Sequence, residues 1–124
     1  MATSTTASIA DPLANTLYTV TETSTKPSAV ALDVDGGTLY AVEIDNTANS
    51  SVAYLHMWNI AAGSVTIGTT DEHYTFMCPA SSRVTYACPG GHVYPTALTA
   101  GIVSSPGGSV GPSATVTAYV LVEN

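Results

Sequence analysis

The residues best suited to bind a metal ion lie close together in the second half of the chain. They are Asp71, Glu72, His73, Cys78, Cys88 and His92. Zinc sites normally contain pairs of Cys or His at short spacing, whereas each Cys here stands alone. Free cysteine also behaves as a small apolar residue that packs well in a core. We therefore predict buried free thiols and no metal site in this region.

A second candidate site is the acidic turn that contains Asp33 and Asp35 before Gly36. This pattern is similar to a fragment of a calcium-binding loop. Calcium takes about six or more oxygen ligands, and the downstream glutamate of an EF-hand loop is missing here. Because Asp and Gly residues are also typical of plain hairpin turns, we predict a turn rather than a calcium site.

Signatures of catalysis are weak throughout the sequence. No Gly-x-Ser-x-Gly elbow occurs, and each His lies on an expected strand or beside a turn. Gly107 and Gly108 are not followed by a helix that would bind phosphate. Paired carboxylates of the glycosidase type stay open, because two acids on different strands can meet in the fold. We predict no catalytic residues and no cofactor, and hence not an enzyme.

The chain carries very little charge for its length. Among 124 residues, two are Lys or Arg and nine are Asp or Glu, and the formal net charge is −7. Nucleic acids and anionic membranes are bound mainly through Lys and Arg, so neither is an expected partner. Because a charge must be desolvated when an interface forms, interface cores are poor in charge. A surface rich in Ser and Thr favours a subunit that packs against copies of itself or against other subunits.

Targeting segments are not expected. Residues 1–14 lack the basic and apolar regions of a secretory signal. Residues 84–122 are free of formal charge, but Thr, Ser, Gly and Pro interrupt them too often for a membrane span. Two cysteines without an export signal are typical of reduced thiols, so we expect Cys78 and Cys88 to be unpaired in a cytoplasm.

The periodicity of the sequence predicts an all-β fold. β-Branched and aromatic residues recur at period two, and clusters of Gly, Pro, Asn and Asp separate the runs. This pattern is typical of an antiparallel β-sandwich or jelly-roll-like domain with about eight short strands. The expected strands cover residues 17–20, 30–34, 38–45, 52–59, 73–78, 83–88, 97–103 and 114–122, with a short extended piece at 64–67.

Two features of this domain can be predicted in more detail. Residues 1–14 contain few bulky apolar side chains, so we expect a flexible N-terminal arm that is ordered by a neighbour, before a single domain at 15–124. Strands 73–78 and 83–88 are expected to pair as a hairpin. That pairing would separate Cys78 from Cys88 by several residue steps, too far for a disulfide.

One expected strand has two apolar faces. Leu55 and Met57 lie on one face, and Tyr54, His56 and Trp58 lie on the other. A central strand covered on both sides explains this pattern without any function. An interface patch at Tyr54, His56 and Trp58 also explains it, since Trp and Tyr are enriched in binding hot spots. A platform that stacks on sugar rings is a third interpretation, with weaker support.

A series of strand and turn motifs extends through the second half of the chain. It consists of Val52-Ala53-Tyr54-Leu55-His56-Met57-Trp58-Asn59, a strand ending in Cys78-Pro79-Ala80, Val84-Thr85-Tyr86, Pro89-Gly90-Gly91, Tyr94, the segment Leu98–Val103, a small-residue loop and a closing Val/Thr/Tyr strand. With these motifs, about residues 38–122 resemble the small β-sandwich virion proteins of tailed bacteriophages. The two cysteines and Trp58 depart from what that resemblance leads us to expect.

The resemblance implies a non-enzymatic structural protein of a phage virion, assembled in the bacterial host cytoplasm. Such proteins are similar to capsid decoration, or cement, proteins that bind the head shell and stabilise it, and to accessory subunits of the head or tail. The implied partners are further copies of the chain, as a homotrimer, and the major capsid protein or other virion subunits. Two alternatives stay open: a tail or fibre subunit, and a carbohydrate-binding module that recognises a host surface glycan.

Overall fold

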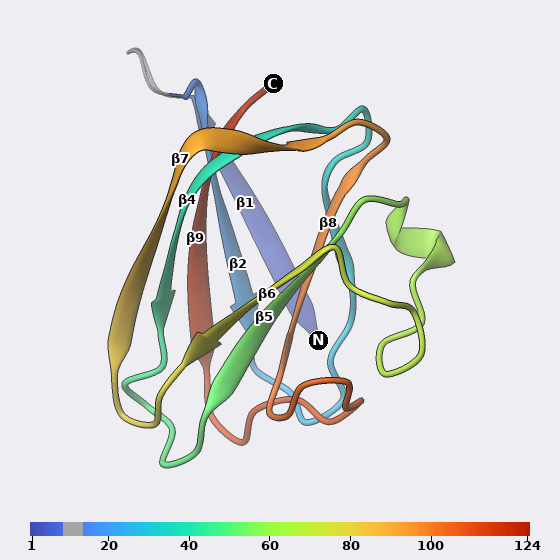
Figure 1. Ribbon diagram of the computed structural model, residues 1–124. Coiled ribbons are helices and arrows are strands. Elements are labelled where there is room, and N and C mark those ends of the chain that lie inside the picture. The colour runs from blue at the N-terminus through green and yellow to red at the C-terminus, as the bar shows by residue number, and fades with distance from the viewer. Residues whose placement is uncertain (9–13) are drawn as a thin grey trace.

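Antiparallel strands make up the regular structure of residues 1–8 and 14–124, which are the residues described by the computed structural model (Figure 1). The predicted all-β class is confirmed. The described residues form the strands β1 (Ala2–Ser8), β2 (Thr16–Glu22), β3 (Val30–Asp33), β4 (Gly37–Asp45), β5 (Ala53–Trp58), β6 (Tyr74–Cys78), β7 (Arg83–Tyr94), β8 (Leu98–Val103) and β9 (Val116–Glu123). A short 3-10 helix, η1 (Ala62–Ser64), lies between β5 and β6.

The strands form two sheets that face each other, as in a β-sandwich (Figure 1). The five-stranded sheet has the order β1-β2-β9-β4-β7, and the four-stranded sheet has the order β3-β8-β5-β6. Many neighbours in a sheet are distant in sequence; in β2 and β9, for example, Val20 lies opposite Ala118. The chain therefore passes repeatedly from one sheet to the other, and its connections gather at the two ends of the sandwich.

The core lies between the sheets, because alternate side chains of each strand point inward. The five-stranded sheet contributes Tyr18, Val20, Leu39, Val42, Ile44, Val116, Ala118, Val120 and Val122 to it. The four-stranded sheet contributes Ala53, Leu55, Met57, Phe76, Leu98, Ala100 and Ile102. Burial of these apolar side chains is the main favourable contribution to folding, at about 25 cal/mol per Å² removed from water.

The predicted hairpin between residues 73–78 and 83–88 is wrong. β6 pairs with β5 in the four-stranded sheet, whereas β7 pairs with β4 in the other sheet. The short connection between them is a corner between sheets. A four-residue turn signal indicates where the chain reverses, but it does not specify whether the next strand returns beside the last one or crosses the core.

The predicted turn at Pro89-Gly90-Gly91 is a bulge inside β7. Leu39 lies opposite His92 and Ala41 lies opposite Ala87, so several residues of β7 face a single residue of β4. Gly91 has a φ of +77°, and a Cβ atom there would lie 2.3 Å from the Thr38 side chain. Glycine thus allows the bulge, and β7 continues to Tyr94 on the same partner strand.

The prediction of a flexible arm at residues 1–14 is wrong for β1. This strand pairs with β2 along its whole length, from Ala2 opposite Glu22 to Ser8 opposite Thr16. A ladder of backbone hydrogen bonds needs no bulky side chains, so the small residues of this segment were a poor guide. The rest of the predicted arm, including Ile9 and Leu13, falls partly on residues 9–13, outside the described residues.

A buried carboxylate holds the region where β1 begins. The Glu22 side chain is fully buried, and Met1 places its ammonium group 2.9 Å from it. The other donors to this carboxylate are the backbone N–H groups of Thr23, Ser24 and Ser28, at 3.1–3.2 Å. Ser28 in turn accepts a hydrogen bond of 2.9 Å from the Ala2 backbone N–H. Such complete pairing is what makes a buried charge tolerable.

Two buried asparagines, directly after β4, hold the corners at the same end of the sandwich. Asn46 donates from its side chain to the carbonyls of Ser51 and Pro79, at 2.9 and 3.1 Å. Asn49 donates to the Ala114 carbonyl at 3.0 Å and accepts from the Ala114 N–H at 2.8 Å. The connections β4–β5, β6–β7 and β8–β9 are thereby joined by side-chain amides.

We expect Asn49→Ala to lower the free energy of unfolding by about 1–3 kcal/mol, because both polar groups of Ala114 lose their partner. Urea denaturation followed by circular dichroism measures this. Ser50→Ala, an exposed substitution in the same connection, is the control and should change stability by less than about 0.5 kcal/mol. Equal stability of Asn49→Ala and the control would show that the amide does not hold the corner.

Candidate functional site

The predicted interface patch at Tyr54, His56 and Trp58 is largely covered within the chain itself. His56 and Trp58 are each 1% exposed, and only Tyr54 of the three is accessible in part. The cover is the connection from β5 to β6, which folds over the outer face of the four-stranded sheet: the Trp58 indole N–H donates to the Thr70 carbonyl at 3.1 Å. In this fold, the central strand covered on both sides is the interpretation that applies to His56 and Trp58.

The same connection corrects a second expectation. Residues 64–67 form no strand; η1 and a following turn occupy this part of the chain. Ile67 reaches toward the outer face of β8, where Gly101 leaves room for the Trp58 ring. A Cβ atom at Gly101 would lie only 3.1 Å from that ring. A short apolar run indicates that its side chains are covered. It fits a strand and a loop that packs on a sheet equally well.

Tyr54 remains at the uncovered end of this face. Its partner across the strand pair is Met77, which is 43% exposed. Single exposed apolar residues are common on protein surfaces, and two neighbours form only a small apolar patch. Of the three residues predicted to form an interface, only Tyr54 is therefore accessible to a partner. His56 and Trp58 pack inside the chain.

His56 is the one buried histidine among the described residues. Its Nδ1 lies 2.9 Å from the Thr75 hydroxyl, and its Nε2 lies 3.4 Å from Glu72 without the alignment of a hydrogen bond. Burial lowers the pKa of His56 below its ordinary value, and the Glu72 carboxylate opposes this shift in part. The side chain is therefore neutral at pH 7.

The lowered pKa of His56 predicts how the free energy of unfolding changes with pH. Below about pH 6.5 the unfolded chain takes up a proton at this histidine before the folded chain does, so stability falls as the pH decreases. The loss is at most about 1.4 kcal/mol per pH unit for one proton. We expect His56→Asn to remove this part of the dependence, measured as the difference in unfolding free energy between pH 7.5 and 5.5. An unchanged difference would contradict the assignment.

The candidate metal ligands do not come together. His92 lies 3.0 Å from the Tyr74 hydroxyl, and His73 packs edge-on against the Tyr74 and Tyr94 rings. Glu72 lies beside His56, on the outer side of the four-stranded sheet. Within the described ranges 1–8 and 14–124, no three or more His, Cys, Asp or Glu residues are grouped as metal ligands.

Both cysteines are free and buried, as expected. The Cys78 thiol donates to the Ser82 carbonyl at 3.3 Å, and burial raises the pKa of both thiols above its ordinary value. Burial also keeps reagents away from the sulfur atoms. The thiolate is the reactive form, so the two residues should be inert in the folded chain.

We therefore expect slow reaction of both thiols with an aromatic disulfide reagent in the native protein and rapid release of two equivalents after denaturation. Cys88→Ser should release one equivalent under the same conditions. Absence of free thiol in denatured protein, prepared without a reductant, would show that a disulfide had formed.

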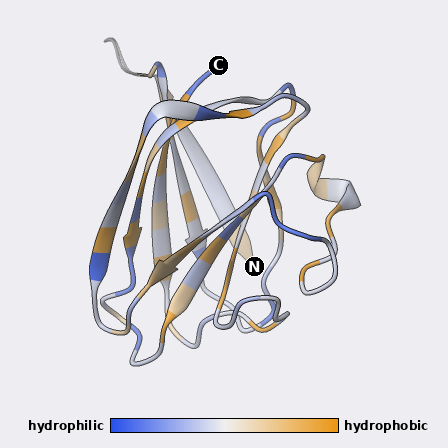
Figure 2. Cartoon of the chain, in the orientation of Figure 1, coloured by the Kyte–Doolittle hydropathy of each residue, from blue (hydrophilic) through white to orange (hydrophobic). Residues whose placement is uncertain are grey.

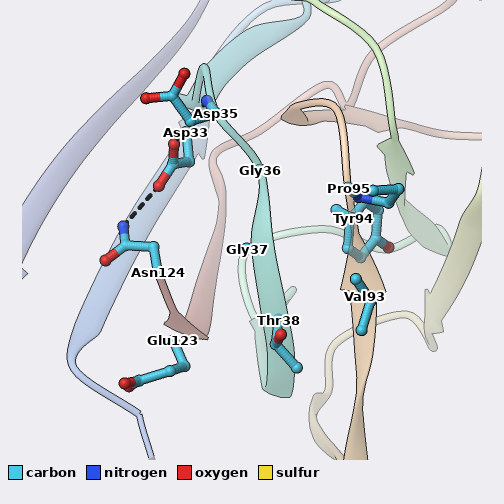
Figure 3. A pocket seen from close by; sticks show the side chains of 10 residues that line it. All are labelled: Asp33, Asp35, Gly36, Gly37, Thr38, Val93, Tyr94, Pro95, Glu123 and Asn124. Carbon is cyan, nitrogen blue, oxygen red and sulfur yellow. Dashed lines mark hydrogen bonds between the residues drawn. The ribbon is translucent and has the colours of Figure 1, made fainter.

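An open pocket of about 540 Å³ lies at the end of the sandwich where the β3–β4 turn, the β7–β8 turn and the end of β9 meet (Figure 3). Its polar side chains are Asp33, Asp35, Thr38, Glu123 and Asn124. Gly36 has a φ of +83°, and a Cβ atom there would lie 2.0 Å from the Tyr94 carbonyl oxygen. Only glycine therefore allows the acidic turn to approach β7 so closely.

One acidic group of this pocket, the Asp33 carboxylate, is hydrogen-bonded within the protein. Asp33 accepts from the Asp35 backbone N–H at 2.8 Å and from the Asn124 amide at 2.6 Å. Asn124 also donates to the Tyr18 hydroxyl at 2.9 Å, and burial raises the pKa of that hydroxyl. The predicted turn at Asp33–Gly36 is thus tied to the end of β9 through the Asp33 carboxylate.

The broadest regular surface is the outer face of the five-stranded sheet. The registers align its outward side chains in three rows that cross all five strands. The rows are Thr3, Thr21, Thr117, Asp45 and Arg83; Thr5, Thr19, Tyr119, Glu43 and Thr85; and Ala7, Leu17, Leu121, Ala41 and Ala87. The first row is mainly hydroxyl groups and the third is entirely apolar. Much of the β1 and β2 ribbon is accordingly pale in Figure 2.

The charges within the three rows lie on β4 and β7, where one cation is paired with two acids. Arg83 lies 3.1 Å from Glu43 and 2.6 Å from Asp45. Hydrogen bonds from Thr47, and to a smaller extent the Arg83 charge, hold the pKa of Asp45 below its ordinary value. The remaining side chains of the three rows are uncharged, so within these rows β1, β2 and β9 carry no ionised side chain, and Glu123 follows at the end of β9.

No protein-family model matches the chain, and no curated protein is significantly similar to it. Among the described residues, no helix has the length and hydropathy required to cross a membrane.

Proposed function

We propose that this chain is a non-enzymatic structural protein of a bacteriophage virion, a decoration or cement protein that binds the head shell and stabilises it. Its partners are the major capsid protein or other virion subunits and further copies of the chain, as a homotrimer, and it is assembled in the bacterial host cytoplasm. The phage assignment and the trimer rest on the resemblance of residues 38–122. The binding role rests on the surface chemistry described above.

The observation that carries the binding role is the outer face of the five-stranded sheet. Its rows of hydroxyl and apolar side chains can be removed from water at small cost, because a hydroxyl needs one or two new hydrogen bonds and a methyl group needs none. A charged surface would need an exact set of opposite charges. Stable interfaces bury about 800 Å² on each partner, which a face of five strands can supply.

The mechanism that follows is non-covalent clamping. A rigid sandwich lays one flat face across neighbouring shell subunits, and the contact area adds to the stability of the shell. Nothing in this mechanism requires a cofactor, a metal or a catalytic group. Compensation of Arg83 by Glu43 and Asp45 keeps the charged side of the face from selecting strongly for an opposite charge.

Particles of the phage that lack the chain are the means to test the proposal. We expect purified protein to co-sediment with them and to raise the temperature at which they release DNA. Thr19→Arg, in the uncharged part of the face between Thr5 and Tyr119, should weaken binding at least tenfold, because an uncompensated charge would be buried. Ser50→Arg, on a connection at one end of the sandwich, is the matched control and should bind as the unmodified chain does.

Two results would contradict the proposal. Failure of folded protein to bind the particles would exclude the decoration role, and equal binding of Thr19→Arg and Ser50→Arg would exclude the proposed face. Quantitative mass spectrometry of intact particles distinguishes the tail or fibre alternative. A decoration protein should be present in numbers comparable with the major capsid protein, whereas a tail subunit should match the tail proteins.

A further inference from the structure

The described residues contain four sheet edges, and three of them are blocked. β3 is short and its register with β8 is irregular, and β7 carries the bulge at residues 88–91 and the charge of Arg83. At the edge strand β6, the Tyr86 hydroxyl donates to the Met77 carbonyl. Short strands, bulges, charges and covering side chains are the usual means by which proteins prevent edges from pairing with other chains.

The fourth edge, β1, is covered only at its first residue, where the Ala2 backbone N–H donates to Ser28. Its seven residues, Ala2–Ser8, include no charge, no proline and no glycine, and its pairing with β2 is regular throughout. The side chains of residues 3–7 are exposed on both faces of the strand. β1 thus extends the five-stranded sheet beyond the cover of the opposite sheet, and its outer edge offers unpaired backbone groups to another strand.

The sequence of β1 is compatible with its own copy in antiparallel orientation. If two copies pair with Thr5 opposite Thr5, maximal overlap brings Thr3 opposite Ala7 and Ser4 opposite Thr6. Every pair then consists of small uncharged side chains, with neither steric conflict nor like charges. Because paired residues have the same parity, the rows on the outer face would continue from one sheet into the other.

We propose that the free edge of β1 binds the same edge of a second copy of this chain, centred on Thr5, to join two five-stranded sheets into one. A second copy is the favoured occupant because β1 has no charged or large side chain with which to select a different strand. The contact is isologous and closes with two copies, so it yields a dimer. It does not rest on the proposed virion function, and it is an alternative to the homotrimer, which would need a different surface.

Reciprocal charge substitutions at Thr5 test this contact. In the paired edges the two Thr5 side chains lie opposite each other, with Cβ atoms about 5 Å apart. We expect the unmodified chain to sediment as a dimer. Thr5→Lys alone and Thr5→Glu alone should each weaken dimerisation at least tenfold, since like charges would meet. An equimolar mixture of the two should restore dimers that contain one copy of each, identified by native mass spectrometry.

Thr19→Lys is the matched control, because Thr19 lies beside Thr5 on the same face but one strand away from the edge. It should dimerise as the unmodified chain does. Circular dichroism verifies that every variant is folded. A monomeric unmodified chain at the highest attainable concentration would overturn the proposal, as would dimers or trimers that persist in both Thr5 variants. Failure of the mixture to form the mixed dimer would exclude the register centred on Thr5.

Discussion

The arrangement of the two sheets depends on how the chain turns the corners between them. In a sandwich with so few charges and no disulfide among the described residues, the corners must be held by hydrogen bonds. Asn46 and Asn49 do this at one end, where their amides bind carbonyl and N–H groups of three connections. A side-chain amide suits this position because it donates and accepts without carrying a charge that burial would penalise.

Charged residues are also scarce in the rest of the molecule. Glu22 is buried, but its carboxylate receives backbone N–H donors and the Met1 ammonium group. Arg83 is exposed and is paired with two acids. Most other polar side chains end in hydroxyl or amide groups. Large parts of the surface can therefore contact a partner without the desolvation of ions. This property supports a binding role more directly than any pocket does.

The two sheets differ in what covers their outer faces. A connection that contains η1 covers part of the four-stranded sheet and buries Trp58 and His56. The face of the five-stranded sheet carries no such cover from the described residues, and its edge at β1 is open. The surface that we propose for assembly is therefore on the opposite side of the sandwich from the aromatic residues that first suggested an interface.

The sequence by itself determined the all-β class, most strand positions and the turn at Asp33–Gly36, because period-two patterning and turn chemistry are local properties. The cysteines are free as predicted, but the hairpin used to argue this is replaced by a corner between sheets. Only the tertiary structure decided that β6 and β7 belong to different sheets, that β1 is a strand, and that Trp58 is covered. Each of these depends on a partner distant in sequence. The importance of Asn46, Asn49 and the β1 edge had no sequence signal, since an asparagine in a loop or a Thr/Ser segment looks the same whether or not it has such a partner.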